Sequence, residues 1–300
     1  MELHLPPTSA YTLNPSLDFE SAKQQAIDKR LTIVSSGLGG LFSRPKPEEV
    51  DWVYSEIRLE SFWHMACTVR YVFERNKTFN VPVTGIEVRK VTLLGQEFEV
   101  AAVQQAAQPA QSAGLLQQIG QIGQQIGISS TAPRIFSVAG VEYCVDETKQ
   151  DRFLDAVTGQ AMPTGAEYAK KEKTELTDLS MLSTEEVIVI PPQLSAAKIA
   201  KSVLSGMVKP IQADKILEET TTVEALDLYF RPIYAFEFAW KAKNKTGVAE
   251  FDAVTGSMTN GKAVHTRSDK PLTREALFDI NADTATSLMP VAAGNVKLVE

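Results

Sequence analysis

The chain has 300 residues and a mass of 32.9 kDa, with 37 acidic and 30 basic side chains and a net charge of −7. Its hydrophobic content of 44% and charged content of 22% are ordinary for a folded protein and exclude wholesale disorder. No run of about 18 apolar residues is present, so we expect no integral membrane segment. The acidic balance argues against nucleic acid as the main partner.

The first residues lack the basic and apolar parts of a secretory signal, so we expect a cytoplasmic protein. Both cysteines, Cys67 and Cys144, lie in strand-like apolar runs. In a reducing compartment we expect two free thiols. The sequence leaves open whether they ever pair.

The predicted elements of residues 1–103 are a short strand before Pro6, a helix near Ser21 and a long hairpin that ends at residues 82–85. Residues 35–47 are rich in glycine and proline but lack the Gly-Lys-Ser/Thr of a phosphate-binding loop. We interpret them as a flexible loop. In the functional alternative, its apolar tip docks on a protein partner through Leu38, Leu41 and Phe42.

Residues 104–132 are rich in glutamine, glycine and isoleucine and are predicted to be a flexible insertion or linker. Their apolar residues nevertheless keep a near-helical spacing that places them on one side: Leu115, Ile119, Ile122 and Ile126. The functional alternative is therefore a segment that becomes ordered on a protein partner.

Residues 133–185 are predicted to form a central hairpin followed by a solvated, charged helix over 165–182. Residues 186–300 begin with a strand before Pro191 and continue with a helix, a second hairpin and a C-terminal tail. That helix carries an apolar stripe of helical period, formed by Ala196, Ile199, Ala200, Val203, Leu204 and Met207. We expect the stripe to pack on the hairpin that follows it, against Phe236, Phe238 and Trp240.

A five-residue motif, Asp-Ala-Val-Thr-Gly, occurs at residues 155–159 and again at 252–256. Asp155 and Asp252 are expected to accept hydrogen bonds from backbone N–H groups that follow them, and Gly159 and Gly256 to supply a positive φ. These two structural turns resemble the Asp-x-x-Thr-Gly hairpin ends of PepSY-type modules. The resemblance is confined to the turns, and no function is carried over from it.

The order strand, Pro-Pro, helix and hairpin occurs twice in the chain, once before residue 85 and once after residue 186. This agreement predicts an internal duplication. The predicted fold is therefore α+β, with two similar modules, each an antiparallel sheet with a helix packed on one face.

Known catalytic and metal-binding motifs were sought in the sequence. Of the three histidines, His64 lies three residues from Cys67, a spacing that puts the two side chains on opposite faces of a strand. We find neither a zinc motif nor an EF-hand loop, and we expect no catalytic residue, no metal and no cofactor.

We therefore expect a non-catalytic binding or assembly protein that acts through contacts with another protein or with itself. One alternative is a sensor of small ligands with an apolar pocket between helix and sheet. A third is an enzyme with an unrecognised carboxylate-based site. The identity of the partner, the oligomeric state and the pathway do not follow from the sequence.

Overall fold

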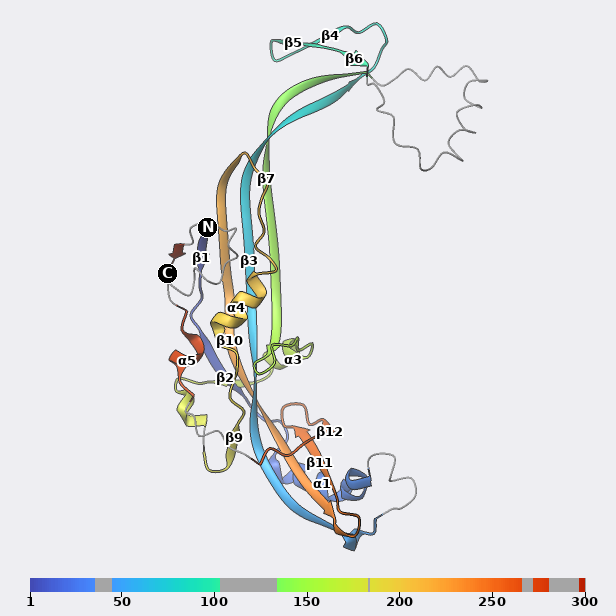
Figure 1. Cartoon of the computed structure of the whole chain (residues 1–300), viewed down its shortest axis with the longest axis vertical. Helices are drawn as coiled ribbons and strands as arrows, with labels where there is room; N and C mark the ends of the chain where they lie inside the picture. Colours follow the sequence, from blue (N-terminus) through green and yellow to red (C-terminus); the bar gives the residue numbers. More distant parts are fainter. Residues whose placement is uncertain (36–44, 103–133, 183, 266–271, 281–296, 300) are drawn as a thin grey trace, which may run out of the picture. The chain divides into compact units, whose positions relative to one another are not determined.

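The computed structural model describes residues 1–35, 45–102, 134–182, 184–265, 272–280 and 297–299 (Figure 1). The chain divides into two compact units. The first comprises Met1–Tyr71, Asp146–Ile211 and Glu218–Glu300, and the second comprises Val72–Val145 and Gln212–Leu217.

Most of the described strand residues belong to one mixed sheet of eleven strands. Its longest strands are β3 (Val50–Val83), β7 (Arg134–Asp155) and β10 (Lys215–Trp240). The shorter strands of this sheet are β1 (Glu2–His4), β2 (Ser9–Leu13), β6 (Ala101–Ala102), β8 (Lys173–Glu175), β9 (Val187–Val189), β11 (Lys245–Asp252), β12 (Met258–Asn260) and β13 (Lys297–Val299). A separate antiparallel hairpin in the second unit consists of β4 (Lys90–Leu93) and β5 (Gln96–Glu99).

The helices within the described residues are short except for the first. They are α1 (Phe19–Ser35), α3 (Gly165–Ala169), α4 (Ala196–Leu204) and α5 (Arg274–Phe278), with single 3-10 turns at η2 (Pro47–Glu49), η3 (Leu179–Leu182) and η4 (Lys241–Lys243). Residues 165–182 therefore form α3, β8 and η3 rather than one charged helix. A contact that is distant in sequence explains the difference, because residues 173–175 pair with β2 as the strand β8.

The prediction of two similar helix-on-sheet modules is wrong. The main strand order is β12-β11-β10-β3-β7-β6, so β3 and β10 are neighbours in a single sheet. Within the first unit their contacts run in opposite directions, from Thr68 with Glu224 to Arg70 with Glu218, which makes the pair antiparallel. The first predicted hairpin is instead the single strand β3, which pairs with β10 of the β10–β11 hairpin, so the two regions cannot form separate modules.

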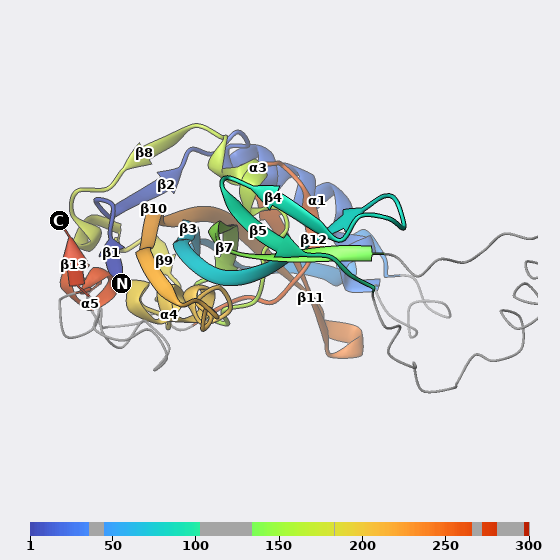
Figure 2. The ribbon, with the colours of Figure 1, turned by 90° about the horizontal axis from the view of Figure 1, so that it is seen from above.

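Two short parallel strands explain why α1 and α4 do not pack on the strand that follows each of them in the sequence. β9 pairs in parallel with β3, whereas β2 pairs in parallel with β10. In the view from above, β2 and β8, together with β1 and β13, are grouped beside β10 (Figure 2). Helix α1 follows β2 in the chain and therefore packs on the β10–β11 hairpin. Helix α4 follows β9 and therefore packs on β3.

Helix α1 covers the aromatic face of β10 and β11. Asp18 precedes the helix and accepts a hydrogen bond from the N–H of Ser21 at 2.8 Å, which satisfies a free donor of the first turn. The buried face of α1 is formed by Ala22, Ala26, Ile33 and Val34. This face packs in one core cluster with Tyr234, Phe236, Phe238, Trp240 and Phe251.

The expected partner of helix α4 was therefore incorrect, although its stripe is buried as the period predicts. Instead of Phe236 and its neighbours, the helix lies against β3. The indole N–H of Trp63 donates to the carbonyl of Leu194 at 2.9 Å, and the Cys67 thiol lies 3.3 Å from the sulfur of Met207. Nothing in the stripe itself distinguishes one aromatic strand face from another.

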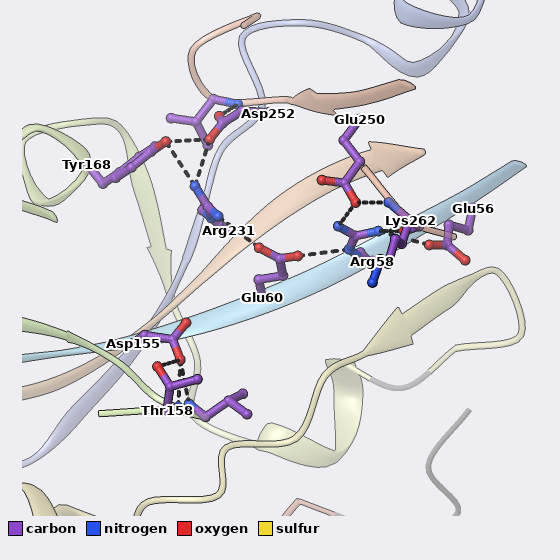
Figure 3. Close-up of polar contacts among 12 residues, drawn as sticks. Glu56, Arg58, Glu60, Asp155, Thr158, Tyr168, Arg231, Glu250, Asp252 and Lys262 are labelled. Atoms are coloured by element: carbon purple, nitrogen blue, oxygen red, sulfur yellow. Dashed lines mark hydrogen bonds and ion pairs between the residues drawn. The ribbon is translucent and has the colours of Figure 1, made fainter. Parts of the chain in front are cut away.

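The two repeated turns share one local geometry. The Oδ1 atom of Asp155 accepts from the N–H groups of Val157 at 3.1 Å and Thr158 at 2.7 Å (Figure 3). Asp252 accepts in the same way from Val254 and Thr255, each at 2.9 Å. The glycines at positions 159 and 256 both have φ of 73°, the left-handed region that favours glycine.

A close approach of α1 to β11 requires glycine at position 247. A Cβ atom there would lie 2.7 Å from the carbonyl oxygen of Ile33 and 3.0 Å from the Cα of Val34. Both are backbone atoms of α1 and cannot rotate away. The helix therefore sits on the strand at a distance that a methyl group does not permit.

Replacing Gly247 with alanine should destabilise the first unit, because the methyl group must push α1 off the β10–β11 face. We expect a loss of about 1–3 kcal/mol, the usual range for overpacking, measured by urea unfolding. Gly206→Ala is the matched control, because a Cβ there meets its nearest atom, the Val203 carbonyl oxygen, at 3.7 Å, an ordinary contact. Equal stability of the two variants would contradict the close approach.

The turn glycines should differ in their tolerance of alanine. At Gly256 a Cβ finds no atom within 4 Å, so Gly256→Ala should cost about 1–2 kcal/mol for the left-handed backbone alone. At Gly159 a Cβ would also lie 2.9 Å from Leu194 Cδ1, so Gly159→Ala should lower the unfolding free energy further. Gly256→Asn should recover most of the loss, because asparagine tolerates this conformation. Thermal unfolding of the three variants in parallel measures these differences.

Candidate functional site

A network of buried and half-buried charges crosses one face of the sheet in the first unit (Figure 3). Glu56, Arg58 and Glu60 alternate along β3 and therefore share a face. The Arg58 guanidinium donates from Nε to Glu60 at 2.9 Å and from Nη1 to Glu56 at 3.1 Å. Its Nη2 donates to Glu250 of β11 at 2.6 Å, so one side chain ties β3 to β11.

A second arginine extends the network toward the repeated turn. Glu60 accepts from Arg58 with Oε1 and from Arg231 Nη2 with Oε2 at 2.8 Å. Arg231 Nη1 lies 3.1 Å from Asp252 Oδ2 and 3.0 Å from the Tyr168 hydroxyl, which itself donates to Asp252. Asp252 therefore shapes its own turn with Oδ1 and anchors the network with Oδ2.

The segment after β12 closes the network at its other end. Glu250 accepts from the N–H of Lys262 at 2.9 Å, and Glu56 accepts from the N–H of Val264 at 2.9 Å. Gly261 permits this approach, since a Cβ there would lie 1.8 Å from the Glu250 carboxyl carbon. The carboxylates thus hold an irregular segment as well as the two arginines.

Burial and ion pairing act in opposite directions on the arginines. Burial lowers the pKa of Arg58, but the hydrogen bond to Glu250 and the charges of Glu60 and Glu250 outweigh it and leave the pKa raised. The pKa of Arg231 is likewise raised, because Glu60 outweighs the effect of burial. The guanidiniums stay charged, and the carboxylates are held by fixed donors. The arrangement is suited to fixing the register of three strands.

Sequence reasoning missed this network. The available signal was the alternation Glu-x-Arg-x-Glu at residues 56–60, which puts three charges on one face of a predicted strand. Arg231, Glu250 and Asp252 are distant in sequence, and their convergence on Arg58 and Glu60 depends on strand order.

His64 and Cys67 contact different groups. The His64 ring stacks on Phe153 with centroids 4.4 Å apart, and its Nε2 lies 3.0 Å from Asp151. Its Nδ1 lies 3.8 Å from Asp227. Burial raises the pKa of the Cys67 thiol to about 11, with a contribution from the negative charge of Glu224, so the group is a neutral thiol at pH 7.

Both cysteines are free thiols in this structure. The predicted docking residues of the two low-complexity segments lie outside the described residues: Leu38, Leu41, Phe42, Leu115, Ile119, Ile122 and Ile126. The predicted turn residues Asp155, Gly159, Asp252 and Gly256 are described, and one of them, Asp252, joins the charged network.

Strand β7 has an open edge in the second unit. Among the described residues, β7 pairs with β3 on one side and with β6 on the other, and β6 reaches only Arg134 and Ile135 (Figure 1). Beyond them, three alternating apolar side chains share one face of the edge strand. Val141 is 58% exposed, Tyr143 66% and Val145 54%. An unpaired edge with apolar side chains is a template for another strand.

A cavity of about 530 Å³ lies in the first unit among Leu5, Pro6, Leu226, Phe278 and Leu298. Its walls come from the segment after β1, from β10, from α5 and from β13. The strand aromatics that the sensor alternative placed in such a pocket, Phe236, Phe238 and Trp240, are instead packed in the α1 core.

The comparisons with known proteins add no family to this geometry. No family model, curated protein or solved structure matches this chain. None of the described helices combines the length and apolarity needed to cross a membrane. The described residues also contain no group of three or more His, Cys, Asp or Glu that could hold a metal ion.

The environment of His64 predicts a pH-dependent stability. Burial opposes its charge, but the nearby carboxylates of Asp227 and Asp151 raise its pKa above 6.5. A raised folded pKa means that the stabilisation is fully present below the unfolded pKa of about 6.5 and is lost as pH rises through the folded value. The stability difference between wild type and His64→Gln should therefore be largest at acidic pH and shrink above neutrality.

Urea unfolding of both proteins across that pH range measures the difference. Asp151→Asn is the matched variant, since it removes the Nε2 partner while leaving His64 in place. The unfolding free energy of Asp151→Asn should depend on pH with the same sign as that of wild type, but less strongly. A difference between wild type and His64→Gln that grows with rising pH would contradict the sign.

Proposed function

We propose that this chain is a non-catalytic binding or assembly protein that recruits another polypeptide by adding a strand to the open edge of β7. The observation that carries this proposal is the exposed row of Val141, Tyr143 and Val145 on an edge whose backbone pairs with no other described strand. In strand addition, main-chain hydrogen bonds supply affinity and alternate side chains supply specificity.

The chain connectivity supports the same surface. Residues 103–133 connect β6 to β7, and β6 pairs with the first residues of β7, Arg134 and Ile135. The segment that sequence analysis nominated for partner binding is therefore attached where the open edge begins. Both features support the proposal that the second unit recognises the partner.

The face of β7 opposite the apolar row carries a charged side chain that forms salt bridges. On the strand face opposite the apolar row, Glu142 lies 2.6 Å from Lys77 and 3.4 Å from Arg75. The charges are confined to that face, and the face with Val141, Tyr143 and Val145 is apolar over this part of the strand. A partner strand would thus meet one apolar and one charged face.

Site-specific photo-crosslinking tests this proposal in the full chain. A photoreactive phenylalanine analogue in place of Tyr143 should give crosslinks to another polypeptide, identified by mass spectrometry of the joined peptides. The same analogue in place of Leu94 is the matched control, because this residue of the second unit is 97% exposed but lies in the β4–β5 turn.

Val141→Lys combined with Val145→Lys should lower the crosslinking yield at position 143 by about tenfold. The reason is that edge lysines oppose strand addition, and both positions are exposed, so the fold should be retained. Equal yields at positions 143 and 94, or a yield unchanged by the two lysines, would contradict the proposal.

A further inference from the structure

The apolar row on β7 restricts how a second strand can pair with it. In an antiparallel pair, directly opposite residues share a face of the sheet. For the same strand in a second copy, the two rows meet on one face only when odd-numbered residues lie opposite odd-numbered residues. A shift of the pairing by one residue would put each row on the opposite face of the other copy.

Among the registers that remain, the one with Tyr143 opposite its own copy places all three apolar residues of each row opposite those of the other copy, and charge separates it from its two neighbours. If residue 142 lay opposite its own copy, Glu142 would face Glu142. If residue 144 lay opposite its own copy, Glu142 would face Asp146. Like charges directly opposite each other destabilise a sheet. When Tyr143 lies opposite its own copy, Glu142 faces Cys144 and Asp146 faces Gly140, and no like charges meet.

The ionisation of Glu142 strengthens this selection. The hydrogen bond from Lys77, together with the positive charges of Lys77 and Arg75, outweighs burial and lowers the pKa of Glu142. Glu142 is therefore a carboxylate at neutral pH. The two neighbouring registers therefore place carboxylates opposite each other, which the register centred on Tyr143 avoids.

We propose that the occupant of the β7 edge is a second copy of this chain, paired antiparallel with Tyr143 on the twofold axis. This inference rests on the proposed function and names its partner. In this register Val141 of each copy faces Val145 of the other, and the two tyrosine rings meet between them. A twofold interface uses the same patch on both subunits, and this row is complementary to itself.

The oligomeric state of the purified full chain provides the first test. Light scattering after size-exclusion chromatography should show a concentration-dependent dimer. Tyr143→Lys should raise its dissociation constant by at least about tenfold, because two lysines then face each other on the axis. Leu94→Lys, a change at a more exposed position in the same unit, should leave it unaltered. A wild-type chain that stays monomeric at every concentration overturns the inference.

Cysteine crosslinking tests the register independently of affinity. Opposite residues in an antiparallel pair have Cα atoms about 4.5–5.5 Å apart, within the range of about 4.4–6.8 Å that a disulfide spans. In a Cys144→Ser background, Tyr143→Cys should form a disulfide-linked dimer. Val141→Cys should form one only when mixed with Val145→Cys.

Disulfides between positions 141 and 143, or between 143 and 145, would show a neighbouring register and overturn the inference. Cys67 can stay in this background because it is buried and its raised pKa keeps it protonated. The two proposals fail separately. A monomeric chain that still crosslinks from position 143 to a different polypeptide would overturn the self-pairing and leave the binding function standing.

Discussion

The antiparallel pairing of β3 with β10 is the constraint on which the rest of this structure depends. Each strand is far longer than the usual 3–10 residues, with 34 residues in β3 and 26 in β10. Because β3 pairs with β10 of the β10–β11 hairpin, the two regions of the chain cannot form separate sheets. The parallel additions of β9 to β3 and β2 to β10 then determine which helix covers which strands.

The charged network follows from the same pairing. Burying Arg58 is favourable only when its charge is compensated, and the compensating carboxylates come from β3 and β11, on either side of β10. Removing one member of a buried pair leaves an unpaired charge, which costs more than the pair contributes to stability. Such a network penalises shifted registers of β3, β10 and β11 and so supports one arrangement of a sheet whose long strands could otherwise slide.

The edge of β7 differs from the strands that the charged network holds in register, because no described strand pairs with it along Val141–Val145. Natural sheets protect their edges with charges, bulges or covering segments. Along Val141–Val145, the strand instead presents alternate apolar side chains on one face and a salt-bridged carboxylate on the other. A surface with this alternation is poorly suited to water and well suited to another strand, which is the reason why we propose it as the recognition surface.

Local features of this protein were determined by the sequence alone. The period of the stripe from Ala196 to Leu204 locates a helix, because helical side chains recur on one face whatever that face contacts. The Asp-Ala-Val-Thr-Gly motif contains its own acceptor and its own glycine, so its turn needs no distant residue. The strand character of residues 62–73 and 233–240 follows in the same way from alternation.

Tertiary structure decided everything that depends on which segments meet. The apolar stripe of α4 marks the buried face of the helix but not the partner of that face, and the parallel pairing of β9, which precedes α4, places the helix beside β3. Glu60 and Arg231 are separated by 171 residues, so only strand order brings them together. The exposure of Tyr143 likewise depends on tertiary structure, because alternation places Tyr143 on one face of β7 but does not decide whether another element covers that face. Sequence periodicity specifies the face of an element, whereas the partner of that face is set by the competition among all faces during folding.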